Sequence, residues 1–350
     1  ALALASLLAI DTATLILVLG GLTIAYTLVG GFAAVIWTDV VQSIVLLLGG
    51  LFCLYLLLSQ MPGGWEQLSA TAARENKFSL GSMDADLLVQ GFWVIFIFGI
   101  VENLKNFSVD QNYVQRFLSA PSEAEAKKSL WLGGLLYIPV SALFFMIGTA
   151  LFVYYLNAPV AGLPGQADKV FPFFIVNELP AGLVGLVIAG VLAAGMSTLD
   201  SSLNSSATVW TVDFYRRLLR PDADDARQVM VIRTTTAVIG VLATAAGLLM
   251  IDARSALDVW WKISAVFGGG MLGLFLCALF YRHMRPRQAM FATAVGVAFV
   301  AWATITSSWD TGTTWQFPLH AMMIGVSGTL VIVVTGFLVS LGSRKSGDGR

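Results

Sequence analysis

Charged residues are scarce in this sequence. Only 12% of its 350 residues are Asp, Glu, Lys or Arg, whereas 57% are hydrophobic. A water-soluble domain has about 25% charged residues, and so few charges cannot solvate the surface of a chain of this length. The composition therefore excludes an ordinary soluble protein and favours a chain whose main solvent is lipid.

Histidine and cysteine are also rare, with two of each. His283 and His320 stand far apart, and Cys53 and Cys277 lie in apolar runs. These residues supply no disulfide framework, no transition-metal ligand set and no histidine-based catalytic centre. We therefore expect no enzyme. The net charge of −1 also argues against a nucleic-acid partner.

Long apolar runs are abundant, and they predict an all-α, polytopic transmembrane helical bundle. A bilayer core of about 30 Å needs about 20 apolar residues in a helix. The chain begins with Ala1 inside an apolar stretch, so we expect it to be N-terminally truncated. After a stub at 1–10, this length predicts spans at 12–29, 32–58, 86–108, 129–155, 180–213, 229–251, 256–281, 288–306 and 319–341.

The segments between these spans alternate in charge. Lysine and arginine are concentrated in 108–128, 213–227, 282–287 and the C-terminal tail, whereas 156–179 and 307–318 are poor in both. Cytoplasmic loops of membrane proteins carry the excess of positive charge. The pattern therefore predicts a multi-pass protein of the cell (plasma) membrane, with its basic loops and C-terminus in the cytoplasm.

The first informative polar residue is Asp39, which lies within the apolar segment 32–58. A carboxylate at that depth costs several kcal/mol unless it is paired, hydrated or bound to a cation. A cation ligand is one interpretation. The other is an interfacial aspartate that caps a helix N-terminus.

A denser polar cluster lies in the predicted span 180–213. Ser197, Asp200, Ser201, Asn204 and Thr208 follow one another at spacings of three and four, so they share one face of a helix. A carboxylate with hydroxyl and carbonyl oxygens suits a hard alkali cation. Alternatively, the hydroxyl residues only join neighbouring helices, but that function does not explain the aspartate.

A third polar stretch, 102–116, starts inside a predicted span and ends in a basic loop. It indicates either a broken helix that exposes backbone at a binding site or, especially for 110–116, an ordinary helix end. Glu102 and Lys105 are spaced to form an ion pair without a transport function.

Three of these segments resemble the sodium–solute symporter family, which includes sodium-coupled glucose, proline, iodide and sialic acid transporters. The fifth core helix of that family is similar to 30–42, GGFAAVIWTDVVQ. The end of its sixth is similar to 110–116, DQNYVQR, and its eighth helix to 193–213. The segments occur in the family's order across nearly the whole chain.

The resemblance implies an inverted-repeat fold of five plus five helices with additional C-terminal helices. Residues 1–58 would end the first repeat, and 59–85 would form an external loop. The second repeat would occupy 86–281, two further helices 282–342, and a cytoplasmic tail 343–350.

The resemblance also implies sodium as the coupling ion. Ala194, Ser197 and Thr198 stand at the family's main sodium site. Asp39, Ser197, Asp200 and Ser201 stand at a second sodium site, where Asp200 replaces a serine of the family.

The implied solute site contains Asn103, Asn106, Phe107 and Trp261. Asn103 matches an asparagine that contacts sugar, whereas the other three differ from the sugar transporter's residues. We therefore expect a symporter that imports a small polar organic solute by alternating access: a sugar, a sugar acid such as sialic acid, or a carboxylate. The alternatives are a proton-coupled transporter of the same fold, in which Asp39 and Asp200 share a proton, and a transporter-like membrane sensor.

Overall fold

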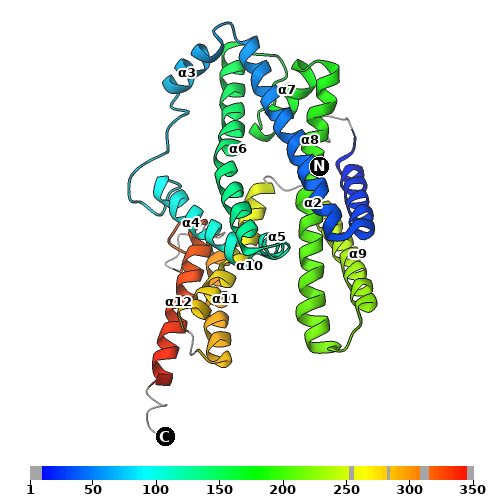
Figure 1. The fold of residues 1–350 in the computed structure, drawn as a ribbon. Coiled ribbons are helices and arrows are strands. Elements are labelled where there is room, and N and C mark those ends of the chain that lie inside the picture. The colour runs from blue at the N-terminus through cyan, green and yellow to red at the C-terminus, as the bar shows by residue number, and fades with distance from the viewer. Residues whose placement is uncertain (1–9, 252–255, 282–283, 308–314, 345–350) are drawn as a thin grey trace. The chain divides into compact units, whose positions relative to one another are not determined.

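Helices make up all the regular structure in the part of the chain that the computed structural model describes, which is residues 10–251, 256–281, 284–307 and 315–344 (Figure 1). Seven helices in these ranges are long and apolar enough to cross a membrane. The predicted stub and most of the tail lie outside the described residues. The all-α, multi-span prediction is confirmed.

The longest helix is α2 (Thr12–Gln60), whose start is capped by Asp11: the Thr14 amide donates to Asp11 Oδ2 over 3.1 Å. Its 49 residues would extend about 74 Å, more than twice the bilayer core. A break at Gly31, with φ 58° and ψ −156°, divides it, because that backbone region is essentially restricted to glycine. Figure 1 shows the chain folding back there. We call 12–30 and 32–60 the first and second segments of α2, and they match the two predicted spans.

The chain forms two compact units, each described by itself: Ala1–Phe78 with Phe117–Asp252, and Ser79–Arg116 with Ala253–Arg350. In the first unit, α2 packs on α8 (Ala181–Val209), α6 (Glu123–Asn157) and α9 (Asp225–Leu249). Side-chain caps mark two helix starts, since Ser122 accepts from the Glu125 amide and Asp224 from the Arg227 amide.

Two short helices lie in segments that the sequence predicts only as connections. They are α3 (Gly64–Arg74) and α7 (Val170–Glu178), the latter after the 3-10 turn η1 (Ala167–Lys169). Neither is long enough to cross a bilayer. Both contribute to an apolar core with the ends of α2, α6 and α8, which contains Leu57, Leu68, Val153, Phe174 and Val187. After α8 the chain continues as the π-helix η2 (Trp210–Leu219).

The second unit contains α4 (Phe92–Val109), α10 (Ala256–Phe280), α11 (Pro286–Ser307) and α12 (Met323–Arg344). The last three pack on one another, and α4 packs on α10 and α12. Val94, Val300 and Phe317 lie in one core, and Cys277 and Ile332 in another. Between the units the chain passes through α5 (Gln111–Leu118).

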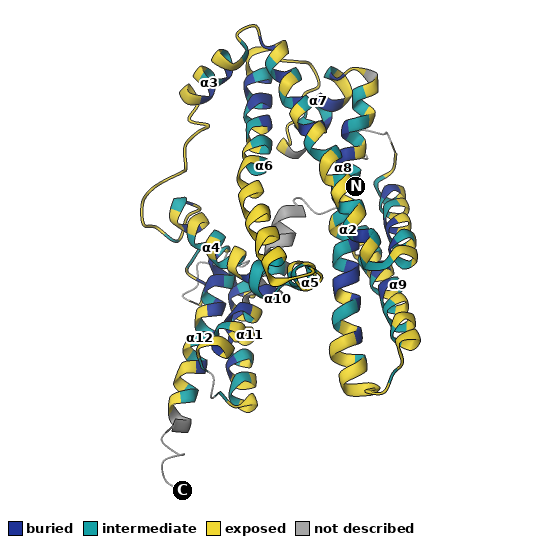
Figure 2. Cartoon of the chain, viewed as in Figure 1, coloured by how far each residue is buried: buried dark blue, intermediate teal, exposed yellow. Residues whose placement is uncertain are grey.

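The spans have many exposed residues (Figure 2), and a large number of these are apolar. Val29, Phe145 and Leu249 have 84%, 79% and 88% of their surface exposed. Contiguous apolar surface on this scale is not stable in water. The helices therefore present the surface that hydrocarbon solvates.

Candidate cation site and solute-site residues

The centre of the candidate cation site is Asp39, on the second segment of α2. The Ser197 hydroxyl of α8 donates to Asp39 Oδ1, and the Ser201 hydroxyl lies 3.5 Å from Oδ2. The two serines lie one turn apart on α8, more than 150 positions after Asp39 in the sequence. Asp39 lies two turns past Gly31, inside the helix. The alternative that it caps a helix N-terminus is therefore wrong.

Asp200 adds a second carboxylate to this cluster. Its side chain is fully buried, with 0% exposed. Ser201 Oγ lies 3.4 Å from Asp200 Oδ1, and the Tyr26 hydroxyl, from the first segment of α2, donates to Oδ2. Ser201 thus stands between the two carboxylates. A buried carboxylate requires such donors, because desolvation of its charge is otherwise costly.

The remaining hydroxyls of α8 have a different arrangement. Thr198 is exposed, and its hydroxyl donates to the carbonyl of Ala194 over 3.0 Å. Ser202, Ser205 and Thr208 likewise donate to carbonyls of their own helix. Of the six predicted sodium residues, the structure therefore gathers Asp39, Ser197, Asp200 and Ser201 in one cluster. Ala194 and Thr198 are paired with each other on the same helix.

The chemistry of this cluster is that of oxygen donors alone: two carboxylates and two serine hydroxyls. Such donors suit hard cations, whereas imidazole and thiolate select transition metals. Within the described residues, no three His, Cys, Asp or Glu side chains gather as a metal site. The oxygen donor set therefore fits a hard cation.

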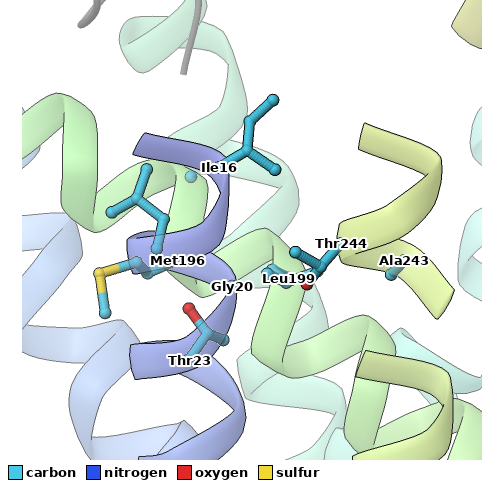
Figure 3. Close-up of a pocket in the computed structure, with 9 residues that line it drawn as sticks. Ile16, Gly20, Thr23, Met196, Leu199, Ala243 and Thr244 are labelled. Atoms are coloured by element: carbon cyan, nitrogen blue, oxygen red, sulfur yellow. The ribbon is translucent and has the colours of Figure 1, made fainter. Parts of the chain in front are cut away.

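Beside the cluster lies a largely apolar cavity of about 180 Å³ (Figure 3). It is bordered by the first segment of α2, by α8 and by α9. Gly195 and Met196, which line it, stand between Ala194 and Ser197 in the sequence. The lining residues are Ile16, Leu19, Gly20, Thr23, Gly195, Met196, Leu199, Ala243 and Thr244.

The predicted solute residues all belong to the second unit. Asn103 is exposed, and its amide donates to the Gly99 carbonyl over 2.8 Å. Asn106 and Phe107 are half-buried, with the Phe107 ring 5.1 Å from that of Tyr113. Trp261 lies in α10 but its side chain is outside the described residues.

The stretch 102–116 contains no break before Val109. There α4 ends, and Asp110 adopts an extended conformation. The Asp110 carboxylate accepts from the Asn112 amide over 2.8 Å, and α5 begins at Gln111. A helix thus ends at Val109, as one interpretation expected, but residues 111–116 form the start of a second helix and not the expected loop.

The expected ion pair in the same helix is present. Lys105 Nζ lies 2.5 Å from Glu102 Oε1, and the two side chains are only 9% and 24% exposed. The lysine packs on α10 at Gly268, where a Cβ would lie 2.9 Å from Nζ. Because Gly268 has no side chain, the Lys105 ammonium group can occupy this space.

One residue that contacts the cation cluster was not predicted. Tyr26 lies in an apolar run, and no periodic pattern distinguishes it. Its partner Asp200 is 174 positions away. Only the fold-back of α2 at Gly31 and the packing of both segments against α8 bring them together.

Comparison with known proteins agrees with this fold. A family model described as the sodium:solute symporter family matches residues 1–296. The sodium/sialic acid symporter NanT of Aliivibrio fischeri is 30% identical over 97% of this chain and 66% of its own length. SiaT of Proteus mirabilis, another sodium/sialic acid symporter, is 29% identical over 97% of this chain and 67% of its own.

More distant relatives include the sodium/glucose cotransporter of Vibrio parahaemolyticus, 28% identical over 85% of this chain and 58% of its own. A solved structure, the substrate-bound outward-open state of a Na+-coupled sialic acid symporter, matches with a TM-score of 0.85 and 28% identity. That match covers 97% of this chain and 68% of the other. The chain thus spans about two thirds of the sialic acid symporters it matches.

Fold and donor set together define a multi-pass membrane protein of the transporter class, with an oxygen-lined cluster between two of its helices. The chain belongs to the sodium:solute symporter family. That family consists of transporters, in agreement with the expectation that this chain is no enzyme.

Proposed function

We propose that the protein is a sodium-coupled symporter that imports a small polar organic solute by alternating access. The observation that carries this proposal is the contact of Asp39 with Ser197 and Ser201 across two transmembrane helices. An intramembrane carboxylate surrounded by hydroxyls is a site for a bound cation. In a family of sodium symporters, that cation is sodium.

In this proposal sodium binds to the four clustered residues Asp39, Ser197, Asp200 and Ser201. Ala194, Ser197 and Thr198 contribute to the family's main sodium site, and the Asp39 cluster forms the second, so Ser197 takes part in both. Asn103, Asn106, Phe107 and Trp261 contact the solute. Names of the relatives favour sialic acids as solutes, with hexoses and monocarboxylates as further classes to test.

The order of binding follows from linkage. Sodium at α8 stabilises the outward-open state, so the solute binds well only after the ion.

Residues 86–281 act as the second inverted repeat. The bilayer encloses the spans, with the basic loops and C-terminus on the cytoplasmic side.

The test is uptake by the purified protein in proteoliposomes, with and without an inward sodium gradient, for sialic acids, hexoses and monocarboxylates. We expect one class to accumulate only with the gradient. Asp39→Asn and Ser197→Ala should each raise the sodium concentration for half-maximal uptake about tenfold or more, since each removes a charge or donor oxygen.

Ser206→Ala is the matched control, because Ser206 is exposed on α8 and nine residues from Ser197, on the opposite side of the helix. It should leave uptake unchanged. Uptake that follows pH and ignores sodium would contradict the proposal and favour proton coupling. Absence of uptake for every solute would favour a sensor.

A further inference from the structure

Tyr26 is the one side chain of the first segment of α2 that reaches the cation cluster in the described contacts. Its hydroxyl donates to Asp200 Oδ2 and lies 3.5 Å from the Met196 carbonyl. A phenol has a single proton to donate. The shorter contact, with the carboxylate, is therefore the hydrogen bond that fixes the ring.

The contacts of Tyr26 continue as a chain of polar groups. Asp200 Oδ2 faces Tyr26, Asp200 Oδ1 faces Ser201, and Ser201 in turn faces Asp39 Oδ2. This chain starts on the first segment of α2, passes through α8 and ends on the second segment. Both sides of the break at Gly31 are therefore connected to one cluster.

The surroundings of Tyr26 are largely apolar and contain another hydroxyl, that of the buried Thr23. One turn earlier, Thr23 borders the cavity together with Met196 and Leu199, and that cavity is largely apolar. If the hydroxyl were removed, Asp200 Oδ2 would be left buried without its donor. The carboxylate would then rotate or draw in water, since a buried charge without a hydrogen bond is costly.

We propose that Tyr26 is a positioning residue of the cation site. By holding Asp200 Oδ2, it keeps Oδ1 directed toward Ser201 and Asp39, where the cation binds. Tyr26 acts through Asp200 and does not itself contact the ion. The inference rests on the proposed function, because it takes the cation at this cluster to be sodium.

Equilibrium binding of radioactive sodium to the purified protein tests this inference without knowledge of the solute. Tyr26→Phe should raise the Kd for sodium about tenfold, the loss expected for one hydrogen bond to a charged group, with the number of bound ions unchanged. The matched control is Tyr137→Phe, which removes the hydroxyl of an exposed tyrosine on α6 and should leave the Kd unchanged.

A second comparison separates positioning from a general effect on folding. In an Asp200→Ser background the phenol has lost its carboxylate partner, so adding Tyr26→Phe should change the sodium Kd less than twofold. If the single variant does not fold, a rise of the sodium Kd by twofold or more on adding Tyr26→Phe to the Asp200→Ser background still overturns the inference. An equal loss in both backgrounds, or no loss in the native background, overturns the inference. If the native protein binds no sodium, the proposed function itself fails.

Discussion

Two pairs of charged side chains lie partly or fully buried in this protein, and they differ in net charge. Asp39 and Asp200 both contact the Ser201 hydroxyl, which brings two negative groups together, whereas Glu102 and Lys105 neutralise each other over 2.5 Å. Two neighbouring carboxylates are suited to a transported cation. A neutralised pair is suited to helix packing, and it needs no ligand.

The ion pair of α4 leads to a prediction about stability. Glu102→Gln should destabilise the protein by about 3 kcal/mol, because Lys105 would remain as an unpaired buried charge. The double variant Glu102→Gln with Lys105→Met should recover most of this loss, since both charges are then absent. Thermal unfolding in detergent micelles measures both effects.

The control for this prediction is an ion pair at the surface. Glu123 and Lys127 lie 2.7 Å apart, with side chains 83% and 69% exposed. Glu123→Gln should change stability by less than about 1 kcal/mol, because solvent screens such a pair. If Glu102→Gln proves no more destabilising than Glu123→Gln, the pair in α4 has no structural importance.

Among the helices, α2 determines the geometry of the cation cluster. Its break at Gly31 lets Tyr26 and Asp39, thirteen residues apart in sequence, both face α8. Because φ is 58° and ψ is −156° at this residue, any side chain strains the backbone whatever the free space. A Cβ at Gly31 would meet no atom within 4 Å, so the strain is purely conformational.

Gly31→Ala should therefore destabilise the protein by about 1–3 kcal/mol and weaken sodium binding, because the two segments would be re-aligned. Gly21→Ala is the matched control: it lies in the first segment, also with no atom within 4 Å of a built Cβ, but with a helical backbone. That variant should be neutral or slightly stabilising. Equal effects of the two substitutions on unfolding and sodium binding would exclude a special function for the break.

How well each element could be predicted depends on its length and periodicity. The long helices follow from apolar runs of about 20 residues, and the predicted spans 12–29 and 32–58 correspond to the two segments of α2. In contrast, α3 and α7 are short and pack through a few apolar residues such as Leu68 and Phe174, so no run marks them. The π-helical end of α8 arises from backbone hydrogen bonding that composition does not encode.

Over the whole molecule, the candidate site was predictable where one helix carried the pattern. The spacing of Ser197, Asp200 and Ser201 predicted a shared face, and Asp39 was conspicuous in an apolar run. Tyr26 was not predictable, because its function depends on a contact between segments 174 residues apart. Pairing of distant helices is a property of the fold, and a single sequence contains no local signal for it.

The orientation of the whole molecule in the bilayer leads to the last prediction. The positive-inside rule places the loop before α6 in the cytoplasm and α3 outside. Ala124, at the start of α6, and Ala73, in α3, are both exposed. In a background without accessible native thiols, Ala73→Cys should react with a membrane-impermeant maleimide on intact cells, whereas Ala124→Cys should react only after permeabilisation. Cys53 and Cys277 are buried and should stay unlabelled in both cases. The opposite labelling pattern would contradict the predicted topology.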